Sequence, residues 1–459
     1  MGGGLMQLVA YGAQDIYLTG NPQITFFKVV YRRHTNFSME AIEQTFNGSA
    51  DFGKRVTCTV SRNGDLMHKV YLQVTVPDVS GEYVKNLGQA LVKFAEVEIG
   101  GQRIDKHYGD WMHIWNELSQ EAGKKEGYGL MTGAGGETAG ISAETDLYIP
   151  LEFWFCRNPG LALPLIALQY HEVKINLEFR DATDCYWAGS GSAISSPSLK
   201  AASLYVDYIY LDTDERRRFA QVSHEYLIEQ VQFTGDESVS SVSNKIKLNF
   251  NHPCKELVWV VQKDEHVDTS ATSGVYGKQW FNYTDALDTT WETGSPLDPY
   301  GGGLTNAKVK LLPLASDATG ITANAPTSGT FPSSTGDVTG NYLSFEYGDT
   351  GFNPVFSAKL QLNGHDRFSE RMGRYFNLVQ PYQHHTNVPS TGINVYSFGL
   401  KPEEHQPSGT CNMSRIDNAT LQLILTAASV AHDAKVRVYA TNYNVLHIMS
   451  GMGGLAYSN

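Results

Sequence analysis

The amino-acid sequence predicts an all-β protein, and both its composition and its pattern carry that prediction. Only 18% of the 459 residues are charged, whereas 44 are Gly, 25 are Tyr and 20 are Phe. Aromatic residues favour strands and Gly favours the turns between them, while low charge disfavours exposed helices. Short runs in which apolar and polar residues alternate also recur along the chain, as is typical of strands with one buried face.

The clearest of these runs ends the segment 158–179. Pro159 and Pro164 each remove a backbone donor, so the first half of the segment predicts an ordered turn rather than a helix. The second half alternates strictly, which predicts a strand with one face on a core. Its predicted core residues are Val173, Ile175, Leu177 and Phe179.

Similar runs predict strands on both sides of this segment. Asn63 and Gly64 separate the first two runs, and Asn-Gly in that position predicts a β-hairpin. Residues 111–121 predict a helix of about three turns. The other predicted strands are residues 56–60, 69–76, 91–99, 148–155, 204–211, 225–233, 245–250, 257–262, 358–362, 395–400, 419–425 and 435–440.

Two stretches rich in small and polar residues predict loops. Residues 123–145 predict a glycine-rich loop. Residues 263–353 predict a much longer loop, with one further strand at 307–312, and loops of that length are usually functional or disordered.

An internal repeat predicts two similar units. In each copy a strand ends in a turn that contains glycine, and an Arg, a Gly and an aromatic residue follow at nearly the same spacing. The first copy reads Val97-Glu-Ile-Gly-Gly101 with Arg103, Gly109 and Trp111, and the second reads Leu360-Gln-Leu-Asn-Gly364 with Arg367, Gly373 and Tyr375.

The repeat, in a chain longer than the roughly 250–300 residues at which single cores stop growing, predicts two consecutive eight-stranded jelly rolls with a few short helices in loops. The predicted order is an N-terminal arm at 1–24, a first jelly roll at 25–212, a charged linker at 213–223, a second jelly roll at 224–445 and a C-terminal tail at 446–459.

The charge distribution argues against direct nucleic-acid binding. The net charge is −13, and the densest basic run, residues 216–218, is flanked by acidic residues. That pattern predicts a solvated, self-compensated linker rather than a phosphate-binding patch. The sequence also predicts neither a signal peptide nor a transmembrane helix.

The five cysteines are scattered and include no C-x-x-C pair. Their number and spacing predict buried thiols in a reducing compartment, and argue against a disulfide frame or a zinc site.

No catalytic residue, cofactor site or metal site is predicted, because each candidate motif is incomplete. Two His-Glu pairs lack the second histidine of H-E-x-x-H and predict surface or turn positions. A third pair, with no Cys or carboxylate near it in the sequence, predicts a solvated loop. The three pairs are His171-Glu172, His224-Glu225 and His384-His385.

Several long segments together resemble the major capsid proteins of the nucleocytoplasmic large DNA viruses, most closely the coat proteins of large icosahedral algal viruses. The matching segments run in the same order through the whole chain. They are residues 8–27, 61–66, 98–105, 158–179, 224–230, 406–412, 414–420 and 442–457.

The resemblance implies two jelly rolls standing side by side and a homotrimer that forms a pseudo-hexagonal capsomer. It further implies that neighbouring capsomers tile an icosahedral shell, with minor capsid proteins beneath it and an internal membrane around the DNA genome. The chain itself is not expected to insert into that membrane. The resemblance also implies that the protein is synthesised and assembled in the host cytoplasm and is located in the virion shell. The loops 123–145 and 263–353 depart from the family pattern, so their details are not carried over.

Five N-x-[ST] sequons are candidate glycosylation sites, since coat proteins of the resembled family are often glycosylated. Asn282, in the long loop, is the best placed by sequence. The five are Asn36, Asn47, Asn282, Asn412 and Asn418.

Two other functions remain open from the residues alone. Jelly rolls also build lectins, so a carbohydrate-binding surface protein that recognises host glycans is the main alternative. Its candidate stacking residues are Trp280, Tyr283 and Trp291. A sandwich-fold glycosidase is the other alternative, and it requires two facing carboxylates in a cleft.

Overall fold

The structure is a computed structural model that describes residues 3–79, 81–133, 143–188, 197–268, 278–286, 352–426 and 433–457. Contacts divide the chain into two units, Met1–Phe37 and Ser38–Asn459. The strand predicted at 307–312 lies outside the described residues.

The first unit contains two short helices, α1 (Gly3–Val9) and α2 (Ile16–Thr19), and neither contains a buried residue. Its large apolar side chains are exposed, among them Phe26 and Phe27. The arm predicted at 1–24 falls within this unit. So much exposed apolar surface is typical of a segment that binds a partner.

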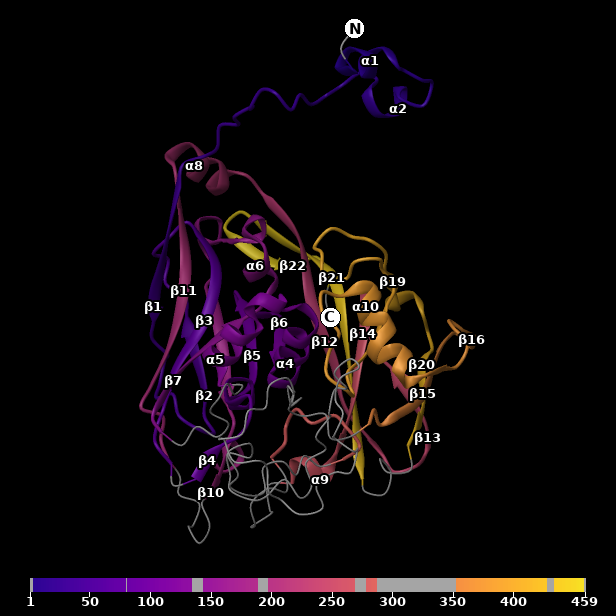
Figure 1. Ribbon diagram of the computed structural model, residues 1–459. Helices are drawn as coiled ribbons and strands as arrows, with labels where there is room; N and C mark the ends of the chain where they lie inside the picture. Colours follow the sequence, from indigo (N-terminus) through magenta and orange to yellow (C-terminus); the bar gives the residue numbers. More distant parts are fainter. Residues whose placement is uncertain are drawn as a thin grey trace, which may run out of the picture. The chain divides into compact units, whose positions relative to one another are not determined.

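The first half of the second unit is a sandwich of two antiparallel sheets (Figure 1). One sheet has the order β1-β11-β3-β7 and the other has the order β2-β9-β5-β6. The strands are β1 (Phe37–Gln44), β2 (Arg55–Thr59), β3 (Leu66–Val76), β5 (Val92–Ile99), β6 (Gln102–Tyr108), β7 (Thr145–Leu151), β9 (Val173–Phe179) and β11 (Ala201–Leu211).

The second half repeats this arrangement. Its sheets have the orders β12-β21-β14-β18 and β13-β20-β15-β16, which match the first pair position by position. The strands are β12 (His224–Val239), β13 (Ser243–Leu248), β14 (Pro253–Lys263), β15 (Val355–Leu362), β16 (His365–Asp366), β18 (Asn394–Ser397), β20 (Ala419–Leu425) and β21 (Ala434–Met449). The prediction of two consecutive eight-stranded jelly rolls is therefore confirmed.

Short elements fill the connections between these strands. In the described residues they are β4 (Gly81–Tyr83), α3 (Leu87–Leu91), α4 (Gly109–Ser119), η1 (Ala122–Lys124), α5 (Lys125–Thr132), α6 (Trp154–Arg157), η2 (Pro159–Leu161), β8 (Leu163–Pro164), η3 (Leu165–Ala167), α7 (Ala182–Cys185), β10 (Tyr186–Ala188), α8 (Thr213–Gln221), α9 (Asp264–Val267), β17 (Arg371–Met372), η4 (Tyr375–Val379), α10 (Gln380–His384), β19 (Cys411–Asn412), η5 (Met413–Arg415) and β22 (Met452–Leu455). The helix predicted at 111–121 is α4.

The repeated motif occupies equivalent places in the two rolls. In each roll it forms a tight hairpin, β5–β6 or β15–β16. The turn residues have positive φ in both hairpins, 57° and 86° at Gly100 and Gly101, and 49° and 81° at Asn363 and Gly364. Two residues with positive φ define a type I′ turn, which explains why Gly and Asn recur there.

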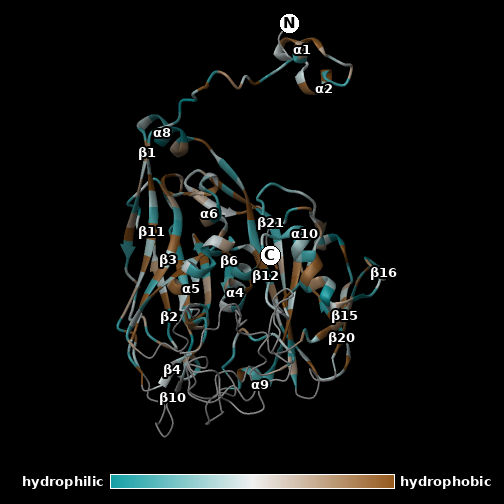
Figure 2. Ribbon diagram, in the orientation of Figure 1, coloured by the Kyte–Doolittle hydropathy of each residue, from teal (hydrophilic) through white to brown (hydrophobic). Residues whose placement is uncertain are grey.

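Each roll has its own apolar core, and hydrophobic residues follow the strands of both rolls (Figure 2). The predicted inward face of β9 is confirmed, since Val173, Ile175, Leu177 and Phe179 are at most 2% exposed. The alternation in the sequence therefore gives the correct register for this strand.

The hairpin predicted at Asn63-Gly64 is wrong, because β2 and β3 lie in different sheets. The chain turns instead towards β11. The backbone N–H of Asp65 donates to Ile209 O at 3.1 Å, and the Asp65 carboxylate accepts the N–H of Leu211 at 2.8 Å. These contacts with a strand far along the sequence outweigh the local turn preference.

The prediction of a loop throughout 123–145 is also wrong, because Lys125–Thr132 forms helix α5. Tertiary contacts stabilise this helix despite its two glycines: the side chain of Gln89 donates to the Tyr128 hydroxyl at 3.0 Å, and Thr132 is buried. The residues predicted as a linker form the exposed helix α8, and the Asp212 side chain caps it by accepting the N–H of Thr213 at 2.8 Å.

Truncation of the β9 core face is expected to destabilise the first roll. Leu177→Ala removes a fully buried side chain and leaves a cavity, so the free energy of unfolding should fall by about 2–5 kcal/mol. The matched control on the same strand is Lys174→Ala, which should change it by less than about 0.5 kcal/mol. Denaturant unfolding measures both, and equal effects would show that the strand register is wrong.

Candidate functional site: the seam between the two rolls

The two rolls meet through helix α4 of the first roll, which packs on the β12-β21-β14-β18 sheet of the second. The apolar residues of α4 recur at positions i, i+3, i+4 and i+7, so they share one helix face. This shared core, here called the seam, comprises Trp111, Ile114, Trp115, Leu118, Val258, Val260, Tyr283, Ile393, Val395 and Tyr439. Each large apolar side chain buried there contributes roughly 1.5–3 kcal/mol.

Strand β14 is buried on both faces as a result. Leu257 and Trp259 face the core of the second roll, whereas Val258 and Val260 face the seam. A strand buried on both sides requires a continuous apolar run rather than alternation. Residues 257–261 read Leu-Val-Trp-Val-Val, which meets that requirement.

A buried ion pair crosses the seam beside this apolar contact. The guanidinium of Arg437 on β21 pairs with Asp110 of α4, and its Nε lies 2.9 Å from Asp236 Oδ1 on β12. Burial by itself lowers the pKa of Arg437, but the charges of Asp110 and Asp236 outweigh it and raise that pKa. The arginine is therefore a fixed positive charge between two carboxylates.

Polar side chains connect the edge strand β12 to the edge strand β6. The amide of Gln230 donates to the carbonyl of Ile104 and accepts from Asn444 Nδ2 at 3.1 Å. The backbone N–H of Val231 donates to Asp105 Oδ1 at 3.1 Å. These bonds satisfy polar groups that the contact between the two sheets would otherwise bury unpaired.

The C-terminal hairpin of the second roll completes the contact. Strand β21 continues to Met449, past the boundary predicted at residue 445, and pairs with β22. The ring of His171 lies 3.0 Å from Gly453 O, and the N–H of Tyr170 donates to Gly451 O at 2.9 Å. The segment 158–179 therefore holds the end of the chain.

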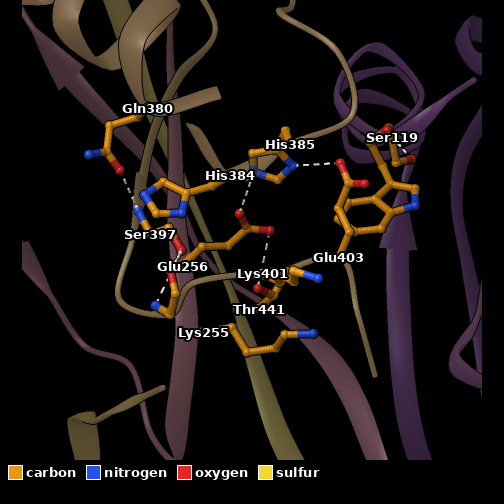
Figure 3. A network of polar contacts seen from close by, with 12 residues as sticks. Ser119, Lys255, Glu256, Gln380, His384, His385, Ser397, Lys401, Glu403 and Thr441 are labelled. Atoms are coloured by element: carbon orange, nitrogen blue, oxygen red, sulfur yellow. Dashed lines mark hydrogen bonds and ion pairs between the residues drawn. The ribbon is translucent and has the colours of Figure 1, made fainter. Parts of the chain in front are cut away.

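A cluster of charged residues of the second roll lies beside helix α4 of the first roll, which carries Ser119 (Figure 3). The side chain of His385 is fully enclosed, with Nε2 2.7 Å from Glu256 and Nδ1 2.8 Å from Glu403. The prediction that His384-His385 forms a solvated loop is therefore wrong for His385. The two carboxylates come from positions distant in sequence, which local inspection does not detect.

The electrostatics of the cluster favour ionised partners. Burial by itself lowers the pKa of His385, but the charges and hydrogen bonds of Glu256 and Glu403 outweigh it and raise the pKa to about 9. Burial by itself raises the pKa of Glu403. The hydrogen bonds from His385 and Thr386 lower it by more than burial raises it, so the net shift is downward. The result is an imidazolium held between two carboxylates.

Glu229 on β12 is the second centre of the cluster. Arg157 of the first roll lies 2.9 Å from it, Lys255 3.0 Å and His405 3.4 Å. Burial raises the pKa of Glu229, but the His405 hydrogen bond and the charges of Arg157 and Lys255 outweigh it and lower the pKa to about 2. Glu229 therefore links the 398–410 loop, through His405, to Arg157 of the first roll.

A cavity of about 550 Å³ adjoins the cluster and is lined by Trp115, Glu152, Arg157 and Glu403, among others. Two carboxylates in a cleft suggest a glycosidase, but that chemistry needs one of them to be an acid with a raised pKa. Glu403 has a lowered pKa and already accepts bonds from His385 and Thr386. Glu403 therefore does not fit the role of that acid.

No group of three or more His, Cys, Asp or Glu side chains able to hold a metal occurs in the part of the chain that the structure describes. Among these same described residues, no helix is long and apolar enough to cross a membrane.

The predicted lectin residues are not arranged as a binding groove. Trp280 is 9% exposed and Tyr283 is 1% exposed, and both pack in cores. The indole N–H of Trp280 donates to Asp184 O at 2.9 Å. Trp291 lies outside the described residues.

The sequons differ in accessibility. Asn36, Asn47, Asn412 and Asn418 are exposed. Asn282 is half-buried, and its amide donates to Gln279 Oε1 at 2.7 Å and accepts from the hydroxyl of the buried Thr284 at 2.7 Å. Its side chain is therefore less available than its position in the sequence suggests.

Sequence comparisons agree with this architecture. Residues 25–212 match the family described as major capsid protein N-terminus, and residues 215–454 match the family described as large eukaryotic DNA virus major capsid protein. The chain is 56% identical to the major capsid protein of Phaeocystis pouchetii virus and 44% identical to that of Paramecium bursaria Chlorella virus 1. Both alignments cover 100% of each chain.

Solved structures give the same result. A chain of the PBCV-1 virus capsid matches with a TM-score of 0.72 and 38% identity, over 95% of this chain and all of that one. The Faustovirus major capsid protein, at 12% identity, shares the fold with a TM-score of 0.69 over 96% of this chain and 94% of that one. The fold and the seam thus define a double jelly-roll viral capsid protein. More particularly, the chain belongs to the major capsid protein family of the large eukaryotic DNA viruses, which confirms the resemblance noted in its sequence.

Removal of the seam arginine is expected to destabilise the whole second unit. Arg437→Met leaves Asp110 buried without its partner, and such a change costs about 3–5 kcal/mol. Lys435→Met, two residues away on the same strand and 39% exposed, is the control and should change the free energy of unfolding little. Denaturant unfolding compares them, and a small effect of Arg437→Met would contradict its role in the seam.

Stability at alkaline pH is expected to depend on His385. Because its pKa rises from 6.5 to about 9 on folding, its contribution is complete below pH 6.5 and is lost as the pH rises through 9. The loss is on the order of 3 kcal/mol. Denaturant unfolding between pH 6.5 and 9 should show that the free energy of unfolding falls less in His385→Gln than in the wild type. His365 is exposed, so His365→Gln should behave like the wild type.

Proposed function

We propose that this capsid protein forms a homotrimer whose six jelly rolls make a pseudo-hexagonal capsomer. The observation that carries the proposal is the pair of rolls with identical strand order, fixed to each other by the seam. Three such pairs around a threefold axis give nearly sixfold symmetry, since each chain supplies two similar blocks.

Neighbouring capsomers would then tile an icosahedral shell around an internal membrane and a DNA genome. The net charge of −13 supports a shell that does not bind the genome directly. The exposed apolar side chains of the Met1–Phe37 unit offer a contact for another protein of the shell, such as a minor capsid protein. Synthesis and assembly would take place in the host cytoplasm.

The role is structural rather than enzymatic. Two of the charged residues that line the cavity, Arg157 and Glu403, are paired within the protein. The four exposed sequons are the proposed points of glycan attachment. Glycan recognition is the weaker alternative, because its described candidate residues are buried.

Light scattering on the purified chain tests the oligomeric state. The expected mass is three times 50.7 kDa, about 152 kDa, because permanent interfaces of this kind commonly bury more than about 2,000 Å². Electron micrographs of the same sample should show particles with a pseudo-hexagonal outline. A stable monomer at micromolar concentration would count against the proposal, and binding to a glycan array would favour the alternative.

A further inference from the structure

Two of the five cysteines lie directly opposite each other on neighbouring antiparallel strands. In the register of β14 and β19, Cys254 faces Cys411. Residues in such pairs have Cα atoms about 4.5–5.5 Å apart. That separation falls within the range of about 4.4–6.8 Å that disulfides span.

The two side chains also share one environment. Cys254 is fully buried in the core of the second roll, and Cys411 is half-buried and packs against the same core. Burial raises the pKa of the Cys254 thiol, and a charge on Cys411 raises it further, as expected for neighbouring sulfurs. The remaining cysteines, Cys58, Cys156 and Cys185, are buried in the core of the first roll.

We propose that Cys254 and Cys411 are a dithiol that oxidises to a disulfide in the folded capsid protein and locks the second roll. This inference goes beyond the shell function and does not depend on trimer formation. The number and spacing of the cysteines predict buried thiols without disulfides, and the proposal changes that expectation for Cys254 and Cys411 only.

The oxidant would be a small disulfide such as oxidised glutathione. Cys411 is the entry point because it is the more exposed of the two, and its thiolate attacks the glutathione disulfide and releases one glutathione thiol. The Cys254 thiol then loses its proton, and its sulfur attacks the Cys411 sulfur and releases the second glutathione. Two thiols become one disulfide, two electrons pass to glutathione, and the two protons end on the released thiols.

The position of the bond gives it a structural consequence. The 398–410 loop, which carries Glu403 and His405 into the charged cluster, is paired to β14 at both ends, through β18 and β19. A bond between Cys254 and Cys411 would make the β19 end covalent. The loop that carries Glu403 and His405 would then be held even where the pH weakens its ion pairs.

The test treats the full-length folded chain with oxidised glutathione, then unfolds it under acid conditions and counts free thiols. The count should fall from five to three as one pair is consumed, and peptide mapping should find residues 254 and 411 cross-linked. The melting temperature should rise on oxidation and return to its starting value after reduction.

Matched variants separate the pair from general oxidation. Cys254→Ala should trap glutathione on Cys411, Cys411→Ser should give neither adduct nor cross-link, and Cys58→Ser should still form the bond. Thermal melting under reducing conditions establishes that each variant is folded. Five free thiols in the treated wild type, or a cross-link between another pair, would overturn the proposal.

Discussion

The packing of α4 on the outer face of the β12-β21-β14-β18 sheet is the contact on which the rest of this structure depends. A jelly roll ordinarily buries one face of each sheet, but this sheet packs on the core of the second roll on one face and on the seam on the other. Relative movement of the rolls would expose Trp111 and Trp115 to water. The hydrophobic effect therefore joins the two repeated domains into one compact unit.

The pairing of charged residues at the junction is a consequence of that burial. Once Asp110, Glu229 and Glu256 are enclosed at the junction, each needs a cationic partner, because an unpaired buried charge costs several kcal/mol. Arg437, Arg157 and His385 supply these charges. The Arg437–Asp110 and Arg157–Glu229 pairs join residues of different rolls, so they also fix the direction in which the rolls meet. A building block of a regular shell needs such a defined geometry, since every copy must present the same surfaces to its neighbours.

The sequence predicted the features that depend on local pattern. The strand at 173–179 was correct because alternation encodes which face is buried, and the duplicated hairpin was detectable because a type I′ turn demands Gly or Asn. Predictions failed where residues distant in sequence determine the local conformation or the environment of a side chain. Asn63-Gly64 looked like a hairpin until contacts with β11 were known, and His385 looked solvated because its carboxylate partners lie 129 and 18 residues away.

The sequence by itself therefore determined the all-β class, the duplication, the register of β9 and the family of the chain. These follow from side-chain periodicity and turn chemistry, which neighbouring residues carry. Only the tertiary structure decided how the rolls are joined, which charges are paired and which cysteines face each other. Those properties arise from chain segments far apart in sequence, and folding brings them together because the apolar faces of α4 and β14 must be removed from water.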